Sequence, residues 1–158
     1  MSIQTSNMGL SVFTSSSHQE HEQKTVGKNA NKTDTGSILV LDDDFDINNM
    51  LKMSLQKHGY NVIGFTDPLL ALEHFKTNLS IYSLVISDLR MPIMNGFEFV
   101  KQVKKMNPKI KVLLMTAFEI NDVEFTRVLP KPKIDEFIQK PISMRKLNGI
   151  IDKYITPE

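Results

Sequence analysis

The chain has 158 residues, of which 41% are hydrophobic and 23% charged, and its formal net charge is +1, as in an ordinary globular domain. A net charge so close to zero gives no bulk field that would favour nucleic acid or an anionic membrane, and the absence of cysteine excludes disulfides, thiolate catalysis and cysteine-based zinc sites. No apolar run approaches the roughly 18 residues of a membrane span, and the N-terminus lacks the basic start and apolar stretch of a secretory signal. We therefore expect a cytoplasmic protein that binds neither membranes nor nucleic acid directly.

The first 36 residues differ from the rest in composition. They are rich in Ser, Thr, Asn, Gln and Lys and contain few large apolar side chains. Such a stretch cannot bury enough surface to offset the entropy of ordering. We therefore expect a disordered polar tail over residues 1–36 and one folded domain over 37–158. Because the chain ends soon after its last predicted helix, we expect no second domain.

The first predicted strand and helix follow the tail. Residues 38–41 form an apolar run that is typical of a buried parallel strand. Gly59 suits the C-cap of the helix that comes next. The i, i+3, i+4 spacing of one helix face is kept by Ile47, Met50, Leu51, Ser54 and Leu55.

Two further strand–helix units are predicted. Residues 60–65 are the second expected strand, and the third strand ends at Ser87. Asp67 and Pro68 suit the N-cap and the first residue of the second helix. We assign the buried face of that helix to Leu69, Leu72, Phe75 and Leu79. The third helix is marked by Phe97, Val100, Val103 and Met106.

The last two units complete the alternation. The fourth strand ends at Met115, and a shorter helix is expected near residues 122–129, before Pro130 and Pro132 bar regular helix. Residues 137–139 form the fifth strand. A last helix, capped by Ser143, carries Leu147, Ile150, Ile151 and Tyr154. This (βα)₅ alternation predicts an α/β domain with a five-stranded parallel sheet and helices on both faces.

Four of the predicted strands stop on side chains suited to phosphate or metal: Asp42 with Asp43, Asp88, Thr116 and Lys140. In an open α/β sheet the ligand lies outside the carboxyl ends of the strands, so these side chains should converge there. Hard carboxylate oxygens suit Mg²⁺ better than a transition metal. The hydroxyl can donate a hydrogen bond to a phosphoryl group, the ammonium can neutralise it, and a carboxylate is a competent covalent phosphoryl acceptor.

A plainer hypothesis explains the same residues one by one. Asp42 and Asp43 would cap the following helix, and Lys140 would be a surface lysine. For any single residue both interpretations stay open. The coincidence at four strand ends favours the phosphate and metal site.

Over about residues 37–157 the chain resembles the receiver domain of two-component response regulators. The resemblance rests on four motifs that occur in the same order and spacing as in that family. They are ILVLDDD at 38–44, SDLRMPIMNG at 87–96, LLMTA at 113–117 and FIQKP at 137–141. The resemblance implies a flavodoxin-like, doubly wound (βα)₅ fold with strand order 2-1-3-4-5. The segment between Thr116 and Phe137 departs from the family pattern, because two prolines stand where the family usually continues its fourth helix.

The resemblance also implies the roles of the residues that handle the phosphoryl group. Asp88 resembles the phosphorylated aspartate of the family. Thr116 and Lys140 match the residues that contact the phosphoryl group, and Phe137 occupies the aromatic switch position. The peptide bond between Lys140 and Pro141 is expected to be cis.

The Mg²⁺ site is implied in the same way. Asp43 resembles the direct metal ligand, and Asp42 the ligand that acts largely through water. Asp88 and the backbone carbonyl of Arg90 would complete the part of the metal shell that the protein supplies. Pro92 and Gly96 are expected to shape the loop that follows Asp88.

Such a domain accepts a phosphoryl group from the phosphohistidine of a histidine kinase or phosphotransfer protein. It then signals by a conformational change, through contacts with a downstream protein in trans. It is not a classical enzyme, although it supports its own phosphorylation and autodephosphorylation. Here the kinase and the target are not specified by the sequence.

Two alternative functions compete with this one. The first is a phosphorylation-independent interaction scaffold that keeps the receiver fold. The second is a haloacid-dehalogenase-like phosphatase with Asp42 as nucleophile and Asp44 as acid/base. That family also needs a late acidic pair after a strand, and beyond Lys140 the only acidic residues are Asp152 and Glu158.

Overall fold

The computed structural model describes residues 35–117 and 133–155. Its sheet has five parallel strands in the order β2-β1-β3-β4-β5. The strands are β1 Ser37–Leu41, β2 Asn61–Phe65, β3 Tyr82–Asp88, β4 Lys111–Thr116 and β5 Glu136–Gln139. The flavodoxin-like α/β fold and its expected strand order 2-1-3-4-5 are confirmed.

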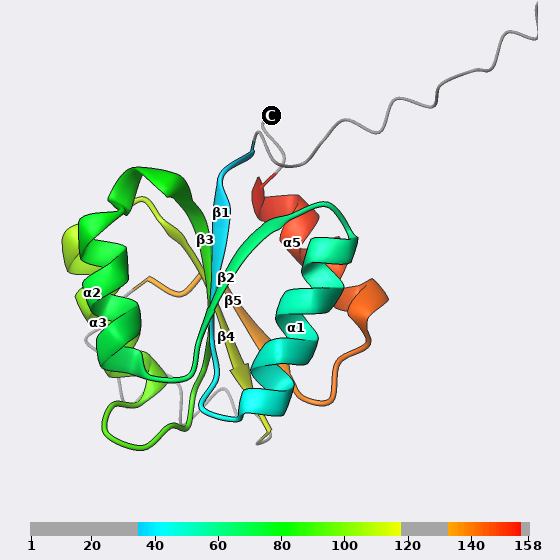
Figure 1. Ribbon diagram of the computed structural model, residues 1–158, viewed down its shortest axis with the longest axis horizontal. Helices are drawn as coiled ribbons and strands as arrows, with labels where there is room; N and C mark the ends of the chain where they lie inside the picture. The colour runs from blue at the N-terminus through cyan, green and yellow to red at the C-terminus, as the bar shows by residue number, and fades with distance from the viewer. Residues whose placement is uncertain (1–34, 118–132, 156–158) are drawn as a thin grey trace, which may run out of the picture.

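The helices lie on both faces of this sheet. They are α1 Phe45–Lys57, α2 Pro68–Thr77, α3 Gly96–Met106 and α5 Met144–Ile155, with a short 3₁₀ helix η2 at Leu79–Ile81. Helices α1 and α5 cover one face, and α2 and α3 cover the other (Figure 1). None of the helices in the described part is long and apolar enough to cross a membrane. The helix expected near 122–129, the two prolines after it and most of the expected tail lie outside the described residues.

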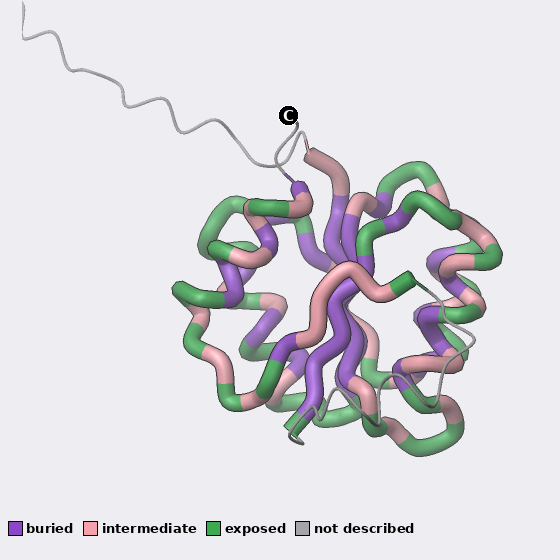
Figure 2. The backbone as a smooth tube through the Cα atoms, turned by 180° about the vertical axis from the view of Figure 1, so that it is seen from behind, coloured by how far each residue is buried: buried purple, intermediate pink, exposed green. Residues whose placement is uncertain are grey.

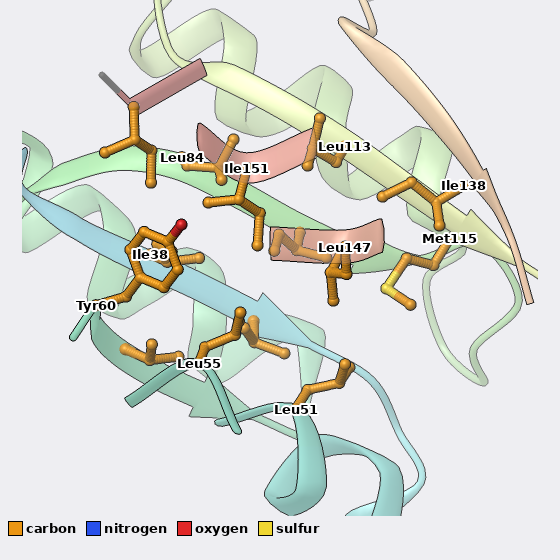
Figure 3. Packing of buried hydrophobic residues seen from close by; sticks show 14 residues of the cluster. Ile38, Leu51, Leu55, Tyr60, Leu84, Leu113, Met115, Ile138, Leu147 and Ile151 are labelled. Carbon is orange, nitrogen blue, oxygen red and sulfur yellow. The ribbon is translucent and has the colours of Figure 1, made fainter. Parts of the chain in front are cut away.

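The sheet divides the core in two. Its central strands β1, β3 and β4 are buried along nearly their whole length, as the purple segments of Figure 2 show. Side chains alternate along β1, so Ile38 and Val40 join the cluster under α1 and α5, whereas Leu39 and Leu41 join the cluster under α2 and α3. Figure 3 shows the first cluster, in which side chains from α1 and α5 meet those of the strands. Burial on both faces explains the continuous apolar runs of the sequence.

The predicted face of α2 was wrong in part. Leu69 is 50% exposed, and Leu79 lies in η2, beyond the end of the helix. The buried residues are Pro68, Ala71 and Phe75. The spacing of large apolar side chains does not indicate Ala71, which is fully buried in the cluster under α2 and α3.

Two other helix faces also needed correction. On α1, Met50 is exposed and the polar Asn48 is buried instead. On α3, Phe99 is fully buried, although the predicted face omitted it. The predicted face of α1 includes an exposed residue, and the predicted face of α3 omits a buried one, so packing against the sheet decides which residues are covered.

The predicted N-caps of α2 and α5 are confirmed. The Asp67 carboxylate accepts the backbone N–H groups of Leu69 and Leu70, and Ser143 Oγ accepts the N–H of Lys146. Gly59 follows the end of α1 with φ of 90°, the left-handed conformation that favours glycine after a helix.

Helix α1 is capped by Asp44, rather than by Asp42 or Asp43. Its Oδ1 accepts the N–H groups of Asp46 and Ile47 at 2.9 and 3.1 Å. One oxygen of this carboxylate thus stabilises the start of α1.

We expect Asp44→Ala to lower the free energy of unfolding by about 1 kcal/mol, because two backbone N–H groups lose their acceptor. Asp44→Asn keeps an oxygen acceptor and is the matched control, with little expected loss. Urea denaturation of the three proteins measures the difference. An equal loss in both variants would show that the negative charge matters, not the cap.

Candidate functional site

Three carboxylates gather at the carboxyl edge of the sheet, which lies at the lower end of the strands in Figure 1. One oxygen each from Asp42, Asp43 and Asp88 lie within 4.8 Å of one another. Asp42 is 2% exposed and Asp88 is 9% exposed, whereas Asp43 is exposed. The expected convergence of these side chains is present in the structure.

The register of the strands explains why residues so far apart in sequence meet. Parallel pairing brings the carboxyl ends of neighbouring strands level, with the pairs Leu41 and Ser87, Asp88 and Met115, and Thr116 and Gln139. A residue at or just after the end of each strand therefore reaches the same edge. Strands β3 and β4 extend to Asp88 and Thr116 themselves, one residue beyond the predicted ends.

Lys140 bridges the two buried carboxylates. Its Nζ lies 2.7 Å from Asp42 Oδ2 and 2.8 Å from Asp88 Oδ1. Burial lowers the pKa of the Lys140 ammonium, but its hydrogen bonds and attraction to both aspartates outweigh burial and raise the pKa overall. Lys140 thus contributes a fixed positive charge to the pocket. The following bond to Pro141 is cis, as the resemblance implied.

Backbone N–H groups hold the remaining oxygens of these two carboxylates. Asp44 N donates to Asp42 Oδ1 at 3.0 Å, and Arg90 N donates to Asp88 Oδ2 at 3.1 Å. Each buried carboxylate therefore accepts from Lys140 on one oxygen and from the backbone on the other. This arrangement fixes both side chains before any ligand binds, and nothing in the sequence pattern indicated it.

The loop after β3 approaches the start of α3 closely at Gly96. A Cβ atom at this position would overlap the Asp88 carbonyl oxygen. Gly96 N donates to the Leu89 carbonyl at 2.8 Å, so the helix start is tied to the residue that follows Asp88. Only glycine allows this approach, in agreement with the expectation that Gly96 shapes the loop.

The two remaining predicted site residues lie on β4 and β5. Thr116 is the last residue of β4 and is 2% exposed. Phe137 is half-buried on β5, with its ring centroid 6.4 Å from that of Phe97 in an edge-to-face arrangement. Thr116 therefore ends the strand that neighbours the strand of Asp88, and Phe137 lies on the next strand, opposite Leu114.

The charges of the pocket favour a divalent cation. Three carboxylates face a single ammonium from Lys140 among the described residues, so the cluster is net negative although it is largely buried. Carboxylate oxygens are the hard ligands that Mg²⁺ prefers. The donor set therefore fits a Mg²⁺ ion at Asp42, Asp43 and Asp88.

Comparisons with known proteins agree with this geometry. The sequence matches the family model of the response regulator receiver domain over residues 38–152. The transcriptional regulatory protein ZraR of Klebsiella oxytoca is 38% identical over 110 residues, which are 70% of this chain and 24% of ZraR. The response regulator receiver protein CpdR of Brucella abortus is 29% identical over 118 residues, which are 75% of this chain and 95% of CpdR.

Coverage differs greatly between these relatives. The chain spans 24% to 26% of the length of the ZraR proteins that it matches. Among solved structures, the response regulator protein TrrA of Thermotoga maritima, in complex with Mg²⁺ and BeF, is 29% identical with a TM-score of 0.66. That match covers 75% of this chain and 98% of TrrA. The likeness thus extends over nearly the whole of CpdR and TrrA but over a small part of ZraR.

Proposed function

We propose, because this chain belongs to the family of response regulator receiver domains, that residues 37–158 accept a phosphoryl group onto Asp88. The chain is a receiver domain of the two-component response regulators. The observation that supports Asp88 as the acceptor is its place in the pocket, where Lys140 binds it and Asp42 together. Residues 1–36 are proposed to form a polar tail outside this domain.

The transfer consists of one bond made and one bond broken. An Asp88 carboxylate oxygen forms the new bond to phosphorus as the P–N bond to the donor imidazole breaks. The electron pair of the broken bond stays on the ring nitrogen, which takes up a proton from solvent. Lys140 neutralises charge on the phosphoryl oxygens, and the Thr116 hydroxyl donates a hydrogen bond to one of them.

The proposed metal site consists of Asp42, Asp43, Asp88 and the backbone carbonyl of Arg90. Asp43 would be the direct ligand, and Asp42 would act largely through water. A bound Mg²⁺ ion would offset the repulsion among the carboxylates and the charge of the incoming phosphoryl group. The gathered carboxylate oxygens and the net negative charge support this assignment.

Signalling is proposed to run through Thr116 and Phe137. When Thr116 turns toward the phosphoryl group, it leaves space into which the Phe137 ring can move. A phosphoryl group then shifts the balance between two arrangements of this surface. The half-buried position of Phe137, in contact with Phe97, is compatible with two positions of its ring.

The proposed partners are a histidine kinase or phosphotransfer protein, which supplies the phosphoryl group, and a downstream protein that is bound in trans. The compartment that this implies is the cytoplasm. Receiver domains are generally not classical enzymes. We propose that this one supports only its own phosphorylation and the hydrolysis of its aspartyl phosphate.

Incubation of the chain with acetyl phosphate and Mg²⁺ tests the proposal. We expect one hydroxylamine-sensitive label, which peptide mapping places on Asp88, and which is lost when EDTA removes the metal. The label requires the metal because the carboxylates otherwise repel the anionic donor. A label on another residue, or one that forms equally well in EDTA, would contradict the proposed site.

A further inference from the structure

Asn48 is a buried polar residue that the proposed chemistry does not use. It lies in α1, is 6% exposed, and its Nδ2 donates to the Phe65 carbonyl at 2.6 Å. The same Nδ2 lies 3.4 and 3.5 Å from the carbonyl oxygens of Val40 and Asp42. One amide thus links α1 to the carboxyl ends of both β1 and β2.

The Phe65 carbonyl connects this amide to the acidic pocket. It also accepts the backbone N–H of Asp42 at 3.2 Å, so Asn48 and Asp42 share one acceptor at the end of β2. In addition, Asn48 N donates to the Asp44 carbonyl at 2.9 Å. The turn from Asp42 to Asp44 is therefore held by both the backbone and the side chain of Asn48.

Strand β2 leaves room for this side chain. A Cβ atom on Gly64 would overlap Asn48 Oδ1, and the φ of Gly64 is not in the left-handed region. The glycine is therefore required by space and not by backbone conformation. Gly64 and Asn48 form a matched pair, although they lie on different elements.

We infer that Asn48 is a positioning residue, which orients the turn carrying Asp42 and Asp43 and so sets the affinity of the acidic pocket for a divalent cation. The inference rests on the proposed function, because it concerns the same metal site. Outer residues that orient metal ligands typically change metal affinity about 10- to 100-fold when they are replaced. A purely structural role would change the stability of the fold alone.

The experiment measures Mg²⁺ dissociation constants by titration calorimetry and unfolding by urea, for Asn48→Ala, Gly64→Ala and the double variant. We expect each single variant to weaken Mg²⁺ binding by about tenfold, because Asn48→Ala removes the amide and Gly64→Ala displaces it. The double variant should bind no more weakly than Asn48→Ala, because the added methyl group no longer meets an amide oxygen. Gly64→Ala keeps every polar atom, so it still tests the inference if Asn48→Ala fails to fold.

Asn148 is the matched control. This second buried asparagine lies on α5, is 8% exposed, and its amide atoms find no hydrogen-bond partner among the described residues. We expect Asn148→Leu to leave the Mg²⁺ dissociation constant unchanged within about twofold, and the free energy of unfolding unchanged or raised.

The outcomes separate the inference from the proposed function. If wild-type protein binds Mg²⁺ and Asn48→Ala is destabilised with an unchanged dissociation constant, Asn48 is structural only. If the losses of Mg²⁺ affinity were additive in the double variant, Gly64 would not act through Asn48, and the inferred coupling between the two residues would be overturned. A wild-type chain that binds no Mg²⁺ would overturn the metal site itself, and the inference with it.

Discussion

Asp88→Asn is expected to abolish phosphorylation while leaving the fold at least as stable in the absence of Mg²⁺. Asparagine has the same shape, so the loop after β3 stays in place, but an amide oxygen is not a competent acceptor. Removal of a covalent nucleophile commonly costs more than about 10³-fold in rate. Labelling by acetyl phosphate, followed by mass spectrometry, measures the loss.

The expected gain in stability follows from the charges around Asp88. With an effective dielectric constant near 20, attraction to Lys140 at 2.8 Å is about 6 kcal/mol. Repulsion from Asp42, of which one oxygen lies within 4.8 Å of an Asp88 oxygen, is about 3.5 kcal/mol on the same scale. Asp43 adds a smaller repulsion, because it is exposed and water screens its charge. Attraction and repulsion therefore offset one another in large part, and burial of the Asp88 charge adds a cost that asparagine avoids. Urea denaturation in EDTA should show a free energy of unfolding that is unchanged or higher.

Asp67→Asn is the matched control for this substitution. Asp67 caps α2 outside the acidic cluster, and asparagine caps a helix about as well. It should change neither the labelling nor the stabilisation by Mg²⁺. If Asp88→Asn were still labelled, the acceptor would be another residue. Partner binding that is insensitive to Asp88→Asn would favour the phosphorylation-independent scaffold.

Lys140→Met is expected to have the largest effect on stability. Methionine keeps the unbranched stem of the side chain but leaves the carboxylates of Asp42 and Asp88 without their shared ammonium. Loss of one partner from a buried ion pair costs about 3–5 kcal/mol. The Lys140 side chain is 17% exposed, so we expect about 3 kcal/mol, the lower end of that range. Urea denaturation in EDTA measures it.

The same variant should respond more strongly to Mg²⁺ than wild type does. The pocket loses a positive charge, so its attraction for a divalent cation rises, and saturating Mg²⁺ restores part of the lost stability. Phosphorylation stays low even then, because no ammonium neutralises the phosphoryl oxygens. Unfolding curves with and without Mg²⁺, together with labelling, separate the two effects.

A second buried lysine provides the control for Lys140→Met. Lys104 pairs with Asp135 at 3.4 Å, and both side chains are largely buried. Lys104→Met should also lower the free energy of unfolding, but without changing the response to Mg²⁺. If both variants responded to Mg²⁺ alike, Lys140 would form a structural ion pair and would not be part of the metal and phosphoryl site.

Much of the candidate site could be predicted from the sequence, because parallel strands impose a simple rule. Apolar runs buried on both faces mark where strands end, and parallel strands bring those ends to one edge. Asp42, Asp88, Thr116 and Lys140 could therefore be placed at this edge before any coordinates were known. The strand order came from the resemblance to receiver domains, since periodicity contains no information on which strands are neighbours.

The environments of the three consecutive aspartates could not be predicted from the sequence. The pattern left open whether Asp42 and Asp43 are ligands or helix caps. In the structure Asp42 is buried against Lys140, Asp43 is exposed at the pocket, and Asp44 caps α1. Adjacent residues of the same type acquire different environments because the chain turns sharply between β1 and α1, and each side chain then points toward different neighbours.

The alternation of strands and helices, and the edge at which the charged residues meet, follow from the sequence alone, because both depend on local periodicity and on the direction of the strands. Tertiary packing sets which side of each helix is covered and which buried polar groups find partners. Asn48 and Gly64 fit together across two elements, and Ala71 rather than Leu69 faces the sheet. Such contacts depend on the packing of elements that are distant in sequence, and no local pattern of residues encodes them.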